Sequence, residues 1–326
     1  MVFEDNRLVP SLYGEQNQNL RKIEEALDVE ISSRGNELLI SGQENAKHQA
    51  AQILEALWHK LQQGQEVDAQ TVDSAIRFLQ NRNTDTLHPD ENGGLHNFTE
   101  TQVQIKTKKK KIQPRSPLQA GYIKAMHDNN LVFGIGPAGT GKTYLAVAMA
   151  VQMLEEGRIE RILLTRPAVE AGERLGFLPG EMKEKMDPYM RPLYDALHDT
   201  MAVEKVQKMM ATEEIEIAPL AFMRGRTLSN SFIILDEAQN TTEQQMLMFL
   251  TRMGERSHMV VTGDPSQIDL PSNVNSGLVQ AERILRNESE MSFIHFTSKD
   301  VVRHRLVTKI INAYDRHKAH KATPEE

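Results

Sequence analysis

The sequence contains no cysteine in its 326 residues, which excludes disulfides and thiolate metal sites. It also has no apolar run near the roughly 18 to 20 residues that a membrane-spanning helix requires. The first ten residues, MVFEDNRLVP, are acidic and lack the apolar core of a signal peptide. From these absences we expect a cytoplasmic protein that does not use a membrane.

Charge is plentiful but unevenly distributed. Hydrophobic residues at 39% and charged residues at 25% are typical of a globular protein with a core, and the length allows about two domains. The net charge is −7, yet residues 91–118 carry 6 Lys or Arg against 2 Asp or Glu. One basic stretch therefore interrupts an otherwise acidic chain.

A glycine-rich stretch, GPAGTGKT at residues 136–143, lies between an apolar run at 131–135 and a helical pattern at 144–156. Strand, glycine loop, Lys-Thr and helix is the arrangement of a phosphate-binding P-loop. Glycines let successive backbone N–H groups face an anion, and the helix dipole adds to the attraction. The residues expected to bind the nucleotide are Gly136, Pro137, Ala138, Gly139, Thr140, Gly141, Lys142 and Thr143.

Two side chains of this stretch have expected chemical roles. Lys142 would neutralise the β- and γ-phosphates of ATP, and the Thr143 hydroxyl would bind Mg²⁺. A chance glycine-rich turn is the alternative. Eight ordered residues with both correct flanks argue against it.

An acidic pair follows a second apolar run, in FIILDEAQ at residues 232–239. We expect Asp236 to be the magnesium-linked carboxylate and Glu237 to be the general base that activates water. A helix N-cap at Asp236 is the alternative. The P-loop about 95 residues upstream favours the catalytic interpretation.

Two glutamines are weaker candidates. Gln267, in VVTGDPSQIDLP at residues 260–271, would sense the γ-phosphate, and Asp264 would orient loop groups or water. An ordinary turn is the alternative there. Gln119 precedes the P-loop strand, where helicase-like NTPases use a glutamine to read the adenine edge; a surface glutamine is the alternative.

A long loop, TRPAVEAGERLGFLPG at residues 165–180, contains Arg166 and Arg174. Long loops beside a nucleotide site are often functional. This loop would hold an RNA phosphate or respond to the γ-phosphate, whereas the alternative is a structural crossover.

Apolar strands alternate with helices from residue 116 onward, which predicts an α/β fold with a mostly parallel sheet covered on both faces. Before it, shorter helices and strands predict a small α/β module. The predicted organisation is a module at 1–80, a polar linker with a basic arm at 81–115, the NTPase domain at 116–315 and a disordered tail at 316–326.

The N-terminal module resembles a KH-type RNA-binding domain. The resemblance lies in VPSLYGEQNQNLRKIEEALDVEI, followed by LLISG and an alanine-rich helix. KH domains clamp a nucleic-acid backbone with a GXXG loop. Gly14 matches that loop, but Asn17 replaces the second glycine and Glu15 adds a negative charge. RNA binding and a purely interacting or oligomerising module therefore remain equal alternatives.

The basic stretch centres on VQIKTKKKKI, with five lysines in six positions, at Lys106 and residues 108–111. Such a strand or arm attracts phosphate backbones without sequence preference. We favour contact with nucleic acid, because the arm leads directly into the NTPase core. The alternative is a solvated linker.

Several motifs together resemble the PhoH family over about residues 100–315. They are the P-loop run, TRPAVEAGERLGFLPG, DPYMRPLYDAL, APLAFMRGRTL, ILDEAQNTT, TGDPSQIDLP and DVVRHRLV. The resemblance implies a Mg²⁺-dependent ATPase with one RecA-like core, motifs akin to those of superfamily 1 helicases, and a link to RNA metabolism. Arg305 departs from the family, which usually has proline there.

The KH-like N-terminus further matches the bacterial branch often called YbeZ. This branch implies a YbeY-type endoribonuclease as partner, and ribosome or rRNA processing as context. We therefore expect an ATP hydrolase that acts on or with RNA. The alternatives are a nucleotide-gated binding protein and a phosphate-stress NTPase without an RNA role.

A single RecA-like core leaves the γ-phosphate open and lacks the arginine that a second core supplies. We therefore expect a homo-oligomer, with a ring as the simplest closed arrangement. Arg303 is the first candidate for the missing arginine and Arg226 the second, and either could act within its own chain. A surface salt bridge is the alternative for each.

Overall fold

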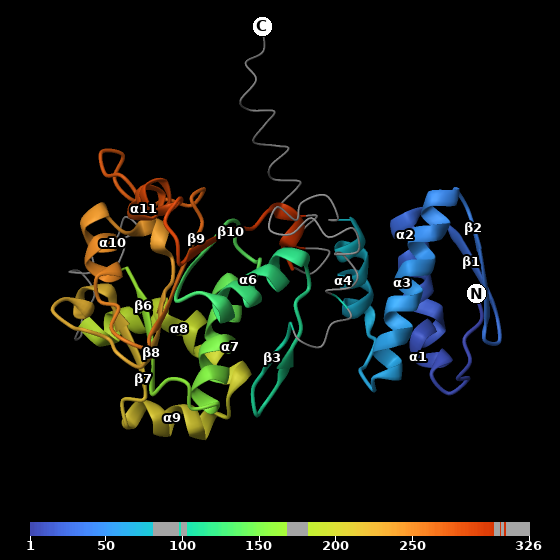
Figure 1. The fold of residues 1–326 in the computed structure, drawn as a ribbon, viewed down its shortest axis with the longest axis horizontal. Helices are drawn as coiled ribbons and strands as arrows, with labels where there is room; N and C mark the ends of the chain where they lie inside the picture. Colours follow the sequence, from blue (N-terminus) through green and yellow to red (C-terminus); the bar gives the residue numbers. More distant parts are fainter. Residues whose placement is uncertain (81–97, 99–102, 168–181, 303–306, 308–309, 311–326) are drawn as a thin grey trace, which may run out of the picture.

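The computed structural model describes residues 1–80, 98, 103–167, 182–302, 307 and 310. Figure 1 shows a helical N-terminal module on one side and a larger α/β core on the other, with a short hairpin between them. Among the described helices, none combines the length and apolar character needed to cross a membrane.

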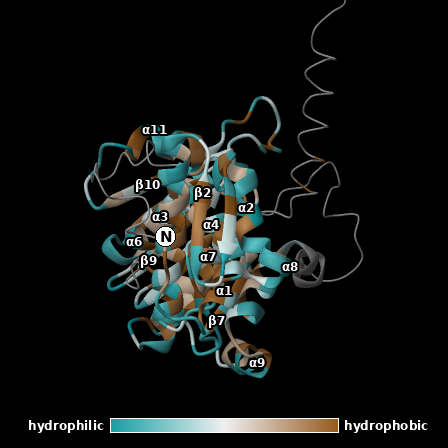
Figure 2. Cartoon of the chain, turned by 90° about the vertical axis from the view of Figure 1, so that its right-hand side faces the viewer, coloured by the Kyte–Doolittle hydropathy of each residue, from teal (hydrophilic) through white to brown (hydrophobic). Residues whose placement is uncertain are grey.

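The N-terminal module, residues 1–80, is built from four helices, one short 3-10 turn and one strand pair. These are α1 (Val9–Tyr13), η1 (Glu15–Asn17), α2 (Gln18–Leu27), β1 (Glu30–Arg34), β2 (Glu37–Ser41), α3 (Glu44–Gln62) and α4 (Ala69–Gln80). The strands pair antiparallel around Gly35, whose φ of 63° suits glycine. Figure 2 looks onto this module, where β2 is mainly hydrophobic and Leu39 is 68% exposed.

The module has a hydrophobic core of its own. In α3, Ile53, Leu54 and Leu57 recur at helical spacing and are fully buried, as the sequence pattern predicted. Ala120, from the α/β core, packs into this same cluster. The module is therefore in contact with the core rather than separated from it by a linker alone.

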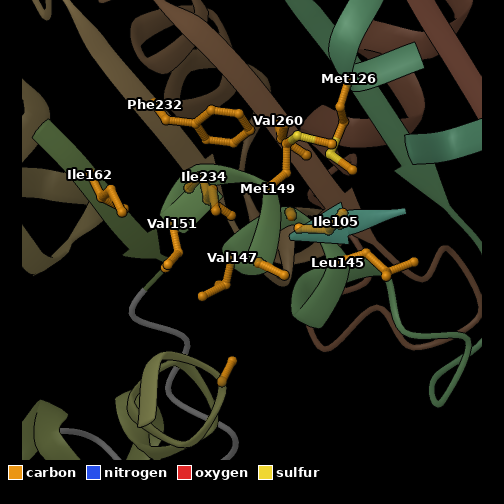
Figure 3. Packing of buried hydrophobic residues seen from close by; sticks show 14 of the residues in the cluster. Ile105, Met126, Leu145, Val147, Met149, Val151, Ile162, Phe232, Ile234 and Val260 are labelled. Carbon is orange, nitrogen blue, oxygen red and sulfur yellow. The ribbon is translucent and has the colours of Figure 1, made fainter. Parts of the chain in front are cut away.

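The lysine-rich segment forms a hairpin rather than a free arm. Strands β3 (Ile105–Lys106) and β4 (Lys111–Ile112) pair antiparallel. Ile105 is fully buried and lies beside Leu145 (Figure 3). Residues 81–97 and 99–102 of the predicted linker lie outside the described residues.

Six parallel strands form the core sheet in the order β10-β5-β9-β8-β6-β7. Their bounds are β5 (Leu131–Ile135), β6 (Arg161–Arg166), β7 (Ile215–Pro219), β8 (Ser231–Leu235), β9 (His258–Gly263) and β10 (Met291–His295). The accompanying helices are α6 (Pro117–Asp128), α7 (Lys142–Glu155), α8 (Met182–Thr200), α9 (Val203–Ala211), α10 (Glu243–Leu250) and α11 (Gly277–Leu285). The predicted α/β fold with a parallel sheet is confirmed.

Successive strand residues point to opposite faces, and each face has its own helices. Ile234 and the other residues on its face of the sheet pack against α6 to α9, as Figure 3 shows for Phe232 and Val260 beside α7. Ile233 and Met259 instead pack against α10 and α11. Both faces are covered, which explains the continuous apolar runs in the sequence. Residues 303–306, 308–309 and 311–315 of the predicted NTPase domain, and all of the predicted tail, lie outside the described residues.

Candidate functional site

The GPAGTGKT stretch follows β5 and turns into α7. Gly136 has a φ of 139°, and a Cβ there would lie 2.4 Å from the backbone oxygen of Phe296. Gly139 and Gly141 have φ values of 84° and 83°, in the left-handed region. Gly141 is also the N-cap of α7, whose first N–H groups have no partner within the helix. The backbone thus has the form of an anion-binding loop.

Lys142 lies on this loop and is buried. Its Nζ donates to the backbone oxygens of Gly136 at 2.6 Å and Pro137 at 2.8 Å. The ammonium group is therefore held at the loop itself, where it can meet the charge of a bound phosphate.

Thr143 and Asp236 meet although 93 residues separate them. The Thr143 hydroxyl donates to Asp236 Oδ1 at 2.6 Å, and the Thr262 hydroxyl donates to the same oxygen at 2.8 Å. Asp236 follows β8 and is 4% exposed. Strand β9 lies between β5 and β8, so the contact reaches across one intervening strand.

The donor set at this point suits Mg²⁺. A hydroxyl and a carboxylate are hard oxygen ligands, and Mg²⁺ keeps several waters and binds substrate phosphates besides one or two protein groups. Within the described part of the chain, no cluster of three or more His, Cys, Asp or Glu is placed to hold a metal. The Thr143 hydroxyl and the Asp236 carboxylate fit a Mg²⁺ ion that also binds the phosphates of a nucleotide.

Glu237 is held by two side chains. Its φ is 54°, a left-handed conformation that turns the residue away from the strand direction. Oε1 accepts from Arg166 at 2.7 Å, and Oε2 accepts from Gln239 at 2.6 Å. The side chain is still 43% exposed, so its carboxylate remains open to water.

Arg166, the last residue of β6, contacts both acids. Its Nε lies 3.0 Å from Asp236 Oδ2, while Nη2 donates to Glu237. Nη1 donates to the backbone oxygen of Tyr189. The Arg166 side chain is only 15% exposed, so its ion pairs with the two acids are partly shielded from water. An arginine of this chain itself therefore lies at the acidic pair Asp236 and Glu237.

The β9 end completes this edge of the sheet. Asp264 accepts from the Ala138 backbone at 3.2 Å and from the Gln267 amide. Burial by itself raises the pKa of Asp264. Hydrogen bonds from Ser266 and Gln267 outweigh this and hold the pKa below its usual value. Gln239 links Glu237 to this segment, since its Oε1 accepts from the Asp264 backbone at 3.0 Å.

These groups surround a cavity of about 600 Å³ at the carboxyl ends of the parallel strands, where ligands of open α/β sheets bind. The predicted residues that line it are Ala138, Gly139, Gly141, Lys142, Thr143, Arg166, Asp236, Glu237, Asp264 and Gln267. Sequence reasoning missed Asp195 and Asp199, which line it from α8. Their spacing of four residues on one helix, which places them on one face, was the available signal.

The remaining candidates are placed differently. Gln119 is buried, accepts from the Arg115 backbone at 2.7 Å and donates to the Thr140 backbone at 2.9 Å, so it supports the loop. Arg226 pairs with both carboxylate oxygens of Glu216 at 2.7 Å and does not line the cavity. Arg303 and Arg174 lie outside the described residues.

Comparisons with known proteins agree with this architecture. The PhoH family model, described as PhoH-like protein, matches residues 111–315. A PhoH-like protein of Bacillus subtilis is 48% identical over 94% of this chain and 93% of its own length. Protein PhoH of Escherichia coli K12 is 43% identical over 62% of this chain and 58% of its own length.

A solved structure, the Sulfolobus solfataricus SWI2/SNF2 ATPase core in complex with dsDNA, covers 55% of this chain and 43% of that one. Its TM-score is 0.32 at 12% identity, which is too low to support an argument. The family match and the Bacillus relative are sufficient by themselves: this chain belongs to the PhoH-like protein family and has its P-loop NTPase fold.

Proposed function

We propose that this protein binds ATP with Mg²⁺ and hydrolyses it, and that it does so in RNA metabolism in the cytoplasm. The observation that carries the proposal is the meeting of Thr143, Asp236 and Glu237 beside the glycine loop. A loop that binds phosphate, a place for the metal and an exposed carboxylate are the parts that phosphoryl transfer to water requires.

Each part has a role in the proposed reaction. The loop N–H groups and Lys142 bind the β- and γ-phosphates, and Thr143 and Asp236 would hold Mg²⁺, which neutralises phosphate charge. Glu237 accepts a proton from the water whose oxygen bonds to the γ-phosphorus. The bond to the β–γ bridging oxygen breaks, and ADP leaves with that oxygen. Gln267 would contact the γ-phosphate side.

Arg166 gives the proposed site a cation from its own chain. It orients Glu237 and balances the charge of Asp236 before a nucleotide arrives. A further arginine at the γ-phosphate remains the reason to propose a homo-oligomeric ring, with Arg303 as candidate. Mixing Arg303→Ala and Lys142→Ala chains should restore part of the activity if that arginine acts between subunits.

RNA as partner is supported by two surfaces. Lys106, Lys108 and Lys111 of the hairpin are exposed and form no ion pair with any described residue, although Lys110 pairs with Asp199. In the GEQN loop, Asn17 adopts a φ of 62°, which asparagine tolerates, so the loop keeps a glycine-like backbone. We therefore propose a KH-like module of the YbeZ type and, from the family resemblance, a YbeY-type endoribonuclease partner.

The discriminating experiment is the steady-state ATPase rate with Mg²⁺, with and without single-stranded RNA. We expect measurable turnover that RNA increases. Hydrolysis that RNA leaves unchanged would favour the phosphate-stress NTPase. RNA binding that depends on ATP, with negligible turnover, would favour the nucleotide-gated binding protein.

A further inference from the structure

A second cavity, of about 730 Å³, opens next to the catalytic one. The two share Gly139, Gly141, Tyr144 and Asp199, which line both. They therefore form one groove that passes the glycine loop. None of the acids assigned to hydrolysis lines the second cavity.

The position of the catalytic groups orients a nucleotide in this groove. Asp236 and Glu237 line the first cavity, so the γ-phosphate end belongs there. A triphosphate on the glycine loop then has its ribose and base on the far side of Gly139 and Gly141. The second cavity is the space that the structure offers on that side.

Three separate parts of the chain make the walls of this second cavity. The core contributes Tyr144 and Gln119, and the segment after the hairpin contributes Arg115. The third wall comes from the start of α4 in the N-terminal module, at Asp68 and Thr71. In Figure 1, α4 is the helix of the module that lies on the side of the hairpin and α6.

Asp68 and Arg115 carry opposite charges into the cavity without touching. No ion pair within 4.0 Å joins them, and the Arg115 guanidinium has no ion-pair partner among the described residues. Burial by itself raises the pKa of Asp68. Hydrogen bonds from Thr71 and the charge of Arg115 outweigh this and lower the pKa. Their charges therefore interact across an open space.

Both groups have the chemistry to bind a nucleoside. A guanidinium plane stacks on an aromatic base. Asp68 uses Oδ1 for the Thr71 backbone at 2.8 Å and the Thr71 hydroxyl at 2.6 Å, and its carboxylate retains acceptor capacity on Oδ2. Such an oxygen can accept hydrogen bonds from ribose hydroxyls and from the exocyclic amino group of a base.

A buried lysine fixes the module wall to the segment that carries Arg115. Lys60 of α3 donates to Gln113 Oε1 at 2.9 Å, and the Gln113 amide donates to Gln65 Oε1 at 2.8 Å. Gln65 precedes Asp68 by three residues. The two walls are therefore held at a defined spacing by buried or half-buried side chains.

We infer that the N-terminal module forms one wall of the nucleotide site, with Asp68 and Arg115 as contacts for the ribose and base of a nucleoside triphosphate. This inference rests on the proposed ATP-binding function, because it assigns the base end of the same ligand. It makes the module part of ATP recognition, so that bound nucleotide joins module and core.

Calorimetric titration of the full chain with two probes tests the inference. The probes are a non-hydrolysable ATP analogue and inorganic tripolyphosphate, which has no ribose or base, each with Mg²⁺. Arg115→Ala and Asp68→Asn should weaken analogue binding by about tenfold and leave tripolyphosphate binding within about twofold of wild type. Asparagine keeps the N-terminal cap of α4, which limits damage to folding.

Arg21→Ala and Glu55→Gln are matched controls on exposed positions of the same module, and both should bind like wild type. Analogue binding by Arg115→Ala and Asp68→Asn that equals wild type would overturn the inference and leave the ATPase proposal intact. Failure of wild type to bind either probe would instead contradict the proposed function.

Hydrogen exchange gives a second readout that needs no variant. The analogue should slow amide exchange in residues 65–74 of wild type, and tripolyphosphate should not, because only the analogue has a nucleoside. Protection confined to residues around the glycine loop with both probes would also overturn the inference.

Discussion

Two loops in this protein depend on unusual backbone angles, and they do so for different reasons. At Gly136 the backbone oxygen of Phe296 leaves no room for a side chain, since a Cβ would lie 2.4 Å from it. At Asn17 in the N-terminal module, φ is 62° but a side chain is present. The first loop requires glycine for space, whereas the second requires only a residue that tolerates the left-handed region.

The difference matches the surroundings of each loop. The P-loop follows β5, which lies between β10 and β9 in the sheet, and its Thr143 joins a partly buried network with Asp236 and Arg166. The GEQN loop is exposed at the edge of a small module, with Glu15 on it. We propose that the core carries the ATPase chemistry and that the module supplies binding contacts, and the following changes test this proposal.

The largest effect is expected for Gly136→Ala. A methyl group would meet the Phe296 backbone, and alanine is strained at a φ of 139°. The variant should lose at least about 3 kcal/mol of unfolding free energy and its nucleotide binding. Urea unfolding and calorimetric titration with ATP measure the two quantities.

The matched change in the module is Asn17→Ala, which also places alanine at a positive φ but is an exposed substitution. It should destabilise by only about 1 kcal/mol and leave ATP binding unchanged. Equal losses in both variants would contradict the distinction between the loops.

The next largest effect, a fall in kcat, is expected for Arg166→Ala. Without the guanidinium, Glu237 loses one of its two orienting contacts and Asp236 loses its ion pair. A misplaced base lowers the rate by about 10²-fold, so kcat should fall by that factor while KM for ATP changes little. Arg161→Ala, at the exposed start of the same strand, is the control and should retain full kcat. An Arg166→Ala rate near wild type would remove this residue from the mechanism.

A smaller effect, on the salt dependence of RNA binding, is expected for lysine substitutions in the hairpin. Each phosphate contact on single-stranded RNA adds about 0.7 to the slope of log affinity against log salt. Changing Lys108 and Lys111 to Gln should flatten the slope by about 1.4, because neither forms an ion pair with a described residue. Changing Lys110 should matter less, since it is bound to Asp199. An unchanged slope would show that these lysines do not contact RNA phosphates and that the hairpin has only a structural role.

The smallest effect is a pH dependence in the module. Burial lowers the pKa of Lys60 from 10.5 to about 8. Between these values the unfolded chain binds the proton and the native chain does not, so the contribution of Lys60 to stability rises with pH. Relative to Lys60→Met, wild type should gain roughly 1–3 kcal/mol between pH 7.5 and 10.5.

Urea unfolding of both chains at the two pH values measures this gain, and Lys47→Met on the same helix is the control. A stability difference that does not change with pH would show that Lys60 titrates normally.

The parts of this structure that the sequence predicted are those with a local pattern. The spacing of Gly136, Gly141 and Lys142 fixes a loop, and runs such as residues 232–235 fix buried strands. The Arg166 contacts could not be predicted in this way, because they require β6 to neighbour β8, and strand order is not encoded in spacing. The docking of the lysine hairpin depends likewise on distant partners, as in the Lys110–Asp199 pair.

The central claim is that this site hydrolyses ATP with Glu237 as the general base, and one measurement tests it most directly. Single-turnover hydrolysis of ATP should be 10²–10⁴ times slower in Glu237→Gln than in wild type, because glutamine cannot accept the proton. ATP binding should be retained in this variant and lost in Lys142→Ala. Near-normal turnover by Glu237→Gln would contradict the account.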